Sequence, residues 1–269
     1  MPNAGLAGLS MYYELAGEGT PVVFISGITA DHAGWKLFQV PAFTAAGYRC
    51  LVFDNRDVGQ TGDSPIPAYP VTQFAADTMA LLDHLELESV HLVGYSMGGM
   101  IAQEIALAHP RRLRTLTLMC SAAKVDAYTR SMLETFAVAR RRLGREEFFR
   151  DLALRVFGHH FYAAGGPQTW LERMLAHPHP QSEAAYLRQT ATILGHDAAE
   201  RVAAIKVRTH VISGAEDIML PPRYSEALAQ SIPGAKLTMV ADAAHAVHVE
   251  QPAEFNRAVL GFLGDPARA

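Results

Sequence analysis

Short apolar runs alternate with longer stretches of helical spacing along this chain of 269 residues. Continuous apolar runs of four or five residues are typical of strands buried on both faces, as in a parallel sheet covered by helices. The runs are Val22–Ile25, Cys50–Phe53, Val90–Val93, Leu116–Met119, His210–Ser213 and Leu237–Val240. Helical spacing predicts helices near 33–46, 72–85, 97–109, 222–232 and 252–263, and segment 7–15 is predicted to add one or two antiparallel edge strands. The alternation predicts a doubly wound α/β fold with a mostly parallel sheet.

One long interval breaks this alternation. From about Ala123 to Arg201 the apolar spacing is helical throughout, and aromatic residues are frequent. These rings are expected to pack against the sheet, and the interval also fits a helical cap that would roof a pocket and keep water out of it. We therefore expect an α/β core made of residues 1–122 and 202–269, with a helical cap (lid) inserted at 123–201.

Composition narrows the classes of function. Hydrophobic residues make up 49% of the chain and charged residues 19%, as in a folded globular protein. The net charge of −4, without long runs of either sign, disfavours a nucleic-acid partner. No stretch approaches 18 apolar residues, and the opening residues lack the pattern of a signal peptide, so we expect no membrane association. The two cysteines, Cys50 and Cys120, fit a reducing cytoplasm rather than a disulfide framework. A homodimer is compatible with the sequence on base rates alone.

The strongest chemical signal is the segment Gly94-Tyr95-Ser96-Met97-Gly98-Gly99, which follows a predicted strand and precedes a predicted helix. Gly-x-Ser-x-Gly at such a turn is a nucleophile elbow, in which glycines permit a very sharp turn and the serine conformation is strained. The turn would lift the Ser96 hydroxyl clear of the sheet and place it at a helix N-terminus, which favours developing negative charge. Ser96 is therefore the predicted nucleophile.

A serine hydroxyl needs a base and a carboxylate that orients the base, and both are expected downstream of it. Asp217 follows the predicted strand at 210–213, and we favour it over its neighbour Glu216. Two histidines compete to be the base. His245 lies in the loop after the last strand, whereas His248 is closer to the final helix, so His245 is favoured.

Four motifs in this order resemble the α/β-hydrolase superfamily over nearly the whole chain: Ser26-Gly27, the stretch 54–61, the elbow, and His245 followed by Glu250 and Pro252. The chain looks most like the small bacterial carboxylesterases, enol-lactonases and polyketide methylesterases. In these relatives the catalytic His is followed by four residues and then Glu-x-Pro, which supports His245. The family usually has Gly before that His, and this chain has Ala244, which affects the expected loop geometry.

The resemblance also implies an oxyanion hole made of two backbone N–H groups. One would come from Met97, the residue after the nucleophile, and the other from Ile28. Relatives often carry His-Gly where this chain has Ser26-Gly27, but a backbone donor does not depend on that side chain. We interpret the turn at 54–57 as structural. His32 and Trp35 lie close enough along the chain either to contact substrate or to pack in the core.

These residues predict a serine hydrolase that cleaves a carboxylic ester or lactone through an acyl-enzyme on Ser96. A serine rather than an aspartate at the elbow argues against epoxide and haloalkane chemistry. A thioesterase or carbon–carbon bond hydrolase with the same triad remains an alternative, as does a non-catalytic ligand-binding protein. No cofactor motif occurs, and the pairs His159-His160 and His177-Pro178-His179 lack the i, i+4 spacing of a helical zinc site. The expected partner is a small acyl substrate with a hydrophobic portion.

Overall fold

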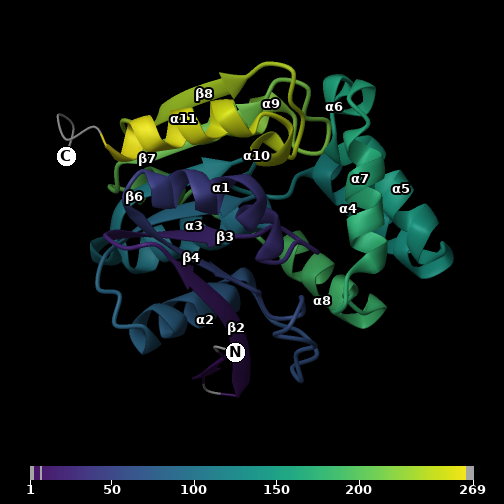
Figure 1. Ribbon diagram of the computed structural model, residues 1–269, viewed down its shortest axis with the longest axis horizontal. Helices are drawn as coiled ribbons and strands as arrows, with labels where there is room; N and C mark the ends of the chain where they lie inside the picture. The colour runs from purple at the N-terminus through teal and green to yellow at the C-terminus, as the bar shows by residue number, and fades with distance from the viewer. Residues whose placement is uncertain (1–2, 7, 265–269) are drawn as a thin grey trace.

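The computed structural model describes residues 3–6 and 8–264, which contain one eight-stranded sheet (Figure 1). The spatial order of its strands is β1-β2-β4-β3-β5-β6-β7-β8. Strands β3 to β8 run parallel, and β1 and β2 are antiparallel additions at one edge. Their bounds are β1 Asn3–Leu6, β2 Leu9–Ala16, β3 Thr20–Ile25, β4 Tyr48–Phe53, β5 Val90–Tyr95, β6 Leu113–Met119, β7 Thr209–Gly214 and β8 Lys236–Val240. The predicted fold class is confirmed, and of the predicted edge segment only residue 7 lies outside the described residues.

Helices cover both faces of the sheet. Helices α1 (Ala33–Ala45) and α11 (Pro252–Leu263) pack on one face, and α2 (Val71–His84), α3 (Met97–Ala108) and α9 (Pro222–Ser231) pack on the other (Figure 1). All five lie within two residues of the predicted bounds. The short helix α10 (Val247–Glu250) and the 3₁₀ turns Pro110–Arg112 and Val202–Ala204 were not predicted, because elements this short leave little periodicity to read.

Side chains of the central strands pack into two separate hydrophobic cores. In β3, Val22 and Phe24 enter the core under α1 and α11, whereas Val23 and Ile25 enter the core under α2 and α3. Alternate residues of a strand point to opposite faces, so a strand covered on both sides has to be apolar throughout. The expectation of burial on both faces is wrong for β8, where Leu237 and Met239 are exposed, because β8 is the edge strand and its helices cover it incompletely.

Residues 123–201, hereafter the helical segment, connect β6 to β7 and hold five helices. These are α4 (Ala127–Arg142), α5 (Arg145–Val156), α6 (His159–Ala163), α7 (Gly166–Ala176) and α8 (Glu183–Leu194). They stand together at one end of the sheet, in teal and green (Figure 1). An antiparallel bridge between Lys124 and Asp197 joins the two ends of the segment, so its helices leave and return at the same place. None of the helices in the described part of the chain is long and apolar enough to cross a membrane.

Candidate active site

Ser96 occupies the turn between β5 and α3 in a conformation that few L-residues adopt, with φ 54° and ψ −117°. The neighbouring glycines make this turn sterically allowed. A Cβ on Gly94 would lie 2.3 Å from the carbonyl oxygen of Gly98, and a Cβ on Gly98 would lie 2.2 Å from that of Ile25. Any side chain at either glycine would therefore clash with backbone. Backbone strain held in place by surrounding packing is concentrated at functional sites.

Ser96, His245 and Asp217 form one chain of hydrogen bonds. The Ser96 Oγ lies 3.0 Å from His245 Nε2, and His245 Nδ1 lies 2.8 Å from Asp217 Oδ2. Since a carboxylate only accepts, Nδ1 carries the proton of the neutral ring, and Nε2 is left to accept from the serine hydroxyl. His245 and Asp217 are buried, whereas Ser96 is partly exposed. The fold thus brings together three residues that the sequence singled out.

The carboxylate of Asp217 is fixed by the loop that follows β7. Its Oδ1 accepts hydrogen bonds from the backbone N–H groups of Met219 and Leu220, at 2.8 and 2.9 Å. Its neighbour Glu216 points elsewhere and accepts from the backbone N–H of His159 at 3.1 Å. Of the two adjacent carboxylates, the geometry brings Asp217 rather than Glu216 to His245.

His248, the competing histidine, lies in α10 and is held among aromatic rings. Its ring centroid is 4.7 Å from that of Tyr95 and 4.6 Å from that of Trp35. Burial, and then the nearby His245, lower the pKa of His248 to about 3. The ring therefore stays neutral and packs beneath the site, without a hydrogen bond to Ser96 among the described contacts.

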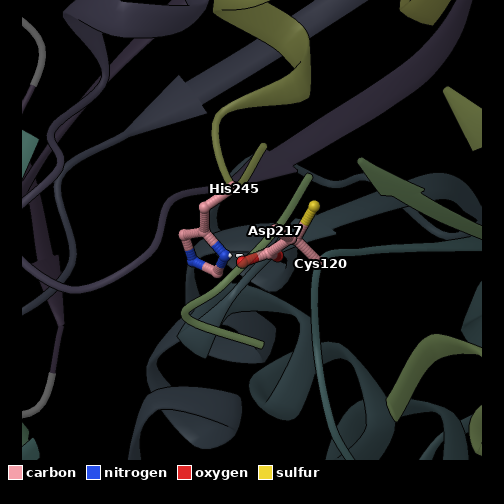
Figure 2. A group of neighbouring side chains, drawn as sticks. All are labelled: Cys120, Asp217 and His245. Carbon is pink, nitrogen blue, oxygen red and sulfur yellow. Dashed lines mark hydrogen bonds and ion pairs between the residues drawn. The ribbon is translucent and has the colours of Figure 1, made fainter. Parts of the chain in front are cut away.

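Cys120 lies beside the His245–Asp217 pair (Figure 2). Its Sγ, a carboxylate oxygen of Asp217 and a ring nitrogen of His245 all lie within 4.8 Å of one another. Burial, and then the charge of Asp217, raise the pKa of the Cys120 thiol well above its usual value, so the sulfur stays protonated and neutral. A metal ion held by this trio would have to displace the hydrogen bond between His245 and Asp217. Two other sets of suitable spacing in the described chain are Asp31, His32 and Asp54, and His160, Glu216 and Asp242.

The loop after β3 approaches Ser96 closely. A Cβ on Gly27 would lie 3.1 Å from the Ser96 Cβ, so the glycine allows the next peptide to reach the serine. That peptide carries the N–H of Ile28, and Ile28 lines the cavity above Ser96. Met97 is the first residue of α3, where backbone N–H groups have no partner inside the helix. The loop that carries Ile28 therefore lies against Ser96, and Met97 follows Ser96 directly in the chain.

Side chains behind this loop hold it in place. The Ser26 hydroxyl accepts from Trp35 Nε1 at 2.9 Å and donates to the carbonyl oxygen of Asp31 at 3.0 Å. His32 Nδ1 lies 2.7 Å from Asp54 Oδ1. His32 and Trp35 are both buried, and neither lines the cavity, so of the two roles left open for them the structure supports packing.

The turn at 54–57 is held by buried polar bonds. Arg56 donates to both carboxylate oxygens of Asp77, at 2.6 and 2.7 Å. Asp57 accepts from Arg188 of α8, again through both oxygens, at 2.6 and 2.9 Å. The turn therefore ties the helical segment to the core, in agreement with the structural role expected for it.

A cavity of about 540 Å³ lies above Ser96. Its floor is formed by Ser96, His245 and the loop after β3, and its walls come largely from α5 and α7 of the helical segment. The apolar side chains on these walls include Phe149, Phe157 and Trp170. A mostly apolar cavity with a few polar groups converging on one end is the usual form of a small-molecule site.

Sequence reasoning missed the contacts that join the helical segment to this site. Gln189 of α8, fully buried, accepts from the backbone N–H of Thr29 at 3.3 Å and donates to the carbonyl oxygen of Arg56 at 2.9 Å. Glu250 accepts from the backbone N–H groups of Gly158 and Ala244, at 2.6 and 2.9 Å. The sequence analysis noted Glu250 through its Glu-x-Pro motif but not this contact, whereas a glutamine within a helical pattern carries no such signal.

Comparisons with known proteins agree with this architecture. Residues 20–252 match the family model for the alpha/beta hydrolase fold. The chain is 30% identical over 265 residues to a protein of Azorhizobium caulinodans named as carbamate hydrolase RutD, covering 98% of this chain and 99% of the relative. An enol-lactonase structure from Burkholderia xenovorans superposes with a TM-score of 0.89 at 25% identity, covering 98% of this chain and all of the other. BpoC of Mycobacterium tuberculosis, named as a non-heme bromoperoxidase, superposes with a TM-score of 0.87 at 28% identity, with 96% and 97% covered.

The match of the family model covers most of the chain, and the sheet order, the elbow turn and the cavity fit the same conclusion. The chain is a hydrolase that belongs to the alpha/beta hydrolase fold family.

Proposed function

We propose that this protein is a serine hydrolase that cleaves a carboxylic ester or lactone. The observation that carries the proposal is the hydrogen-bonded chain from Ser96 Oγ through His245 to Asp217, at 3.0 and 2.8 Å, with the serine open to the cavity. This arrangement can activate the serine hydroxyl at neutral pH, because the neutral imidazole accepts the hydroxyl proton while the buried carboxylate orients the ring.

The reaction would proceed in two steps. His245 accepts the Ser96 proton as Oγ attacks the carbonyl carbon, and Asp217 stabilises the imidazolium that forms. The backbone N–H groups of Ile28 and Met97 would donate to the oxyanion. His245 then protonates the departing alcohol, which leaves an acyl group on Ser96. Water attacks this acyl-enzyme by the same route and releases the acid.

In this proposal the helical segment, residues 123–201, acts as the cap of the active site. The backbone carbonyl of Val156, the last residue of α5, accepts from the N–H of His245 at 3.0 Å, so the cap directly contacts the catalytic loop. Phe157 and Trp170 would cover the acyl portion of the substrate and keep water from it. The names of similar proteins, which include an enol-lactonase, are compatible with acyl chemistry of this kind.

Hydrolysis of a series of p-nitrophenyl esters, from acetate to long acyl chains, tests the proposal. Wild type should turn over the series with a chain-length optimum set by the cavity, and Ser96→Ala should lose about 10⁶-fold in kcat. A fluorophosphonate should label the peptide that contains Ser96. Ser121→Ala is the matched control, because Ser121 is a fully buried serine whose hydroxyl donates to the Ser96 carbonyl oxygen.

If well-folded wild type hydrolyses no ester or lactone, or if label and activity persist in Ser96→Ala, the proposal is wrong. In the first case, turnover of thioesters or vinylogous diketones would move the same three residues to a thioesterase or a carbon–carbon bond hydrolase. Ligand binding without any turnover would indicate a binding protein.

A further inference from the structure

Charge is distributed unevenly around the cavity above Ser96. Among the described residues that line it, Arg145 and Arg173 are cationic, and Asp31 is the only carboxylate. Asp31 already has partners inside the protein. One of its oxygens lies 2.6 Å from His177 Nε2, and the other accepts from the backbone N–H of Ala33 at 3.0 Å. The cavity therefore carries positive charge that its own acidic residue does not neutralise.

Arg145 forms no ion pair with the described residues. Its guanidinium donates to the backbone carbonyl oxygens of Met174 and Leu175, at 3.2 Å for the latter, and lies 5.9 Å from the ring centroid of Phe149. Burial, and then the nearby cation of Arg140, lower the pKa of Arg145. Only the second of these causes reflects positive potential, and a bound anion would offset that repulsion between the two arginines.

Arg173 lies next in the chain to Met174, whose carbonyl oxygen accepts from Arg145. It precedes Met174 in the last turn of α7, it is exposed, and it makes no hydrogen bond or ion pair within the described chain. Because Arg145 contacts the end of α7, the two guanidinium-bearing residues lie at the same end of the cavity. Arg173 and the exposed His179 also show that this end faces solvent.

The helix geometry places this cationic end away from the reacting groups. Arg145 is the first residue of α5, and Val156, whose carbonyl contacts His245, is the last. Eleven residues at about 1.5 Å each separate them by roughly 16 Å along the helix. Allowing for the reach of an arginine side chain, the distance left between guanidinium and nucleophile is on the order of 10 Å.

The helical segment also differs in charge from the rest of the protein. It holds 11 Lys and Arg against nine Asp and Glu, whereas the remaining residues hold 12 against 18. The cations at the cavity end are therefore carried by the one basic part of an acidic chain. An anionic substrate approaching the protein would be attracted to this part and repelled elsewhere.

We propose that the substrate carries an anionic group, such as a carboxylate, at the end remote from the reacting carbonyl, and that Arg145 and Arg173 bind it. An apolar spacer on the order of 10 Å would connect the two ends, as the helix geometry requires. Phe149 and Trp170 line the cavity within one helical turn of the two arginines, and Trp170 also contacts Phe157, the residue after Val156. The inference rests on the proposed function, since it assigns the substrate class of the same cavity.

Matched esters test this inference. The mono-p-nitrophenyl esters of eight- and ten-carbon diacids carry the free carboxylate on the acyl side, and their methyl-capped counterparts are neutral. A second pair, an ω-acetoxy carboxylic acid and its methyl amide, places the anion on the alcohol side. In one of these pairs kcat/KM should favour the anionic member by about tenfold, the size expected for a charged hydrogen bond near solvent. The preference should shrink as salt rises to about 0.5 M.

Arg173→Glu should abolish the preference, lowering kcat/KM for the anionic ester by at least about tenfold more than kcat/KM for its neutral counterpart. Arg142→Gln is the control, because Arg142 is an exposed arginine of the helical segment that does not line the cavity. Equal kcat/KM within both pairs, or a preference that Arg173→Glu leaves intact, would overturn the inference. Neutral esters separate the two proposals. If they show no Ser96-dependent turnover, the serine hydrolase proposal fails. If they show it but the anionic preference is absent, only the inference about the anionic group fails.

Discussion

The loops at the ends of the parallel strands and the helical segment above them build the site in different ways. The strand loops hold their groups through backbone geometry: glycine contacts allow the turn at Ser96, and two backbone N–H groups fix Asp217. The helical segment contributes side chains instead, with apolar rings and two arginines around the cavity. It is tied to the core by a few polar contacts, among them Arg188 with Asp57 and Gly158 with Glu250.

This difference suggests that the strand loops position the reacting groups and that the helical segment sets specificity. Groups held by backbone tolerate almost no change, because a Cβ at Gly94 or Gly98 would overlap backbone atoms. Side chains on helices can be exchanged without moving the helix, so specificity can change while the reacting groups stay in place. Four predictions, from the largest expected effect to the smallest, test this division.

Asp217→Asn should lower kcat by about 10⁴-fold with little loss of stability. The asparagine oxygen can still accept from the N–H groups of Met219 and Leu220. Its NH₂ group would then face His245 Nδ1 and favour the wrong tautomer. Ester turnover by the purified variant measures the effect, and the neighbouring Glu216→Gln is the control. If Glu216→Gln loses more activity than Asp217→Asn, the assignment of the acid is wrong.

Arg188→Met should lower the free energy of unfolding by about 3–5 kcal/mol, because it leaves the buried carboxylate of Asp57 without its ion-pair partner. Urea denaturation measures the change. Arg150→Met, which removes an exposed pair with Glu146 on α5, should change stability by less than about 0.5 kcal/mol. Similar losses in the two variants would mean that the tie between segment and core is no stronger than a surface ion pair.

Acid should destabilise the sheet through its buried histidines. Burial lowers the pKa of His210 to about 4, with help from Lys236, and that of His91 to about 4, with help from Arg114 and Arg208. In the unfolded chain both would titrate near 6.5, so between pH 6.5 and 4 the unfolded state binds protons that the native state does not. The unfolding free energy should therefore fall across this window, by at most about 3 kcal/mol for each histidine.

His210→Gln measures that contribution, because it removes one of the two groups while its amide can still bond to Thr238. The unfolding free energy of wild type and variant is measured against pH, each relative to its own value at pH 8. At that pH the histidine is neutral in both the folded and the unfolded protein. The variant should show a shallower slope below pH 6.5. An unchanged slope would assign the acid sensitivity to other groups.

Trp170→Ala should have the smallest effect, and one confined to specificity. It removes a ring that lines the cavity, so KM for eight-carbon esters should rise by roughly tenfold while kcat for the acetate ester stays near wild type. A parallel fall in kcat for all esters would instead show that the helical segment also positions the reacting groups.

The sequence by itself determined the fold class and the elbow, because both depend on short-range patterns. Continuous apolar runs required strands covered on both faces, and Gly94, Ser96 and Gly98 met the needs of one sharp turn between a strand and a helix. The prediction was weaker for β8, because the same apolar pattern occurs at an edge strand whose side chains are incompletely covered.

Tertiary structure alone decided what surrounds those residues. Gln189 reaches a loop 160 residues away, Cys120 comes to lie beside a histidine 125 positions later, and Arg145 meets the end of a helix 29 residues further along. Such contacts depend on how helices pack rather than on local periodicity, and packing is selected by the sum of many weak interactions. For this reason the reacting groups could be predicted from the sequence, whereas the charge of the cavity became visible only in the folded chain.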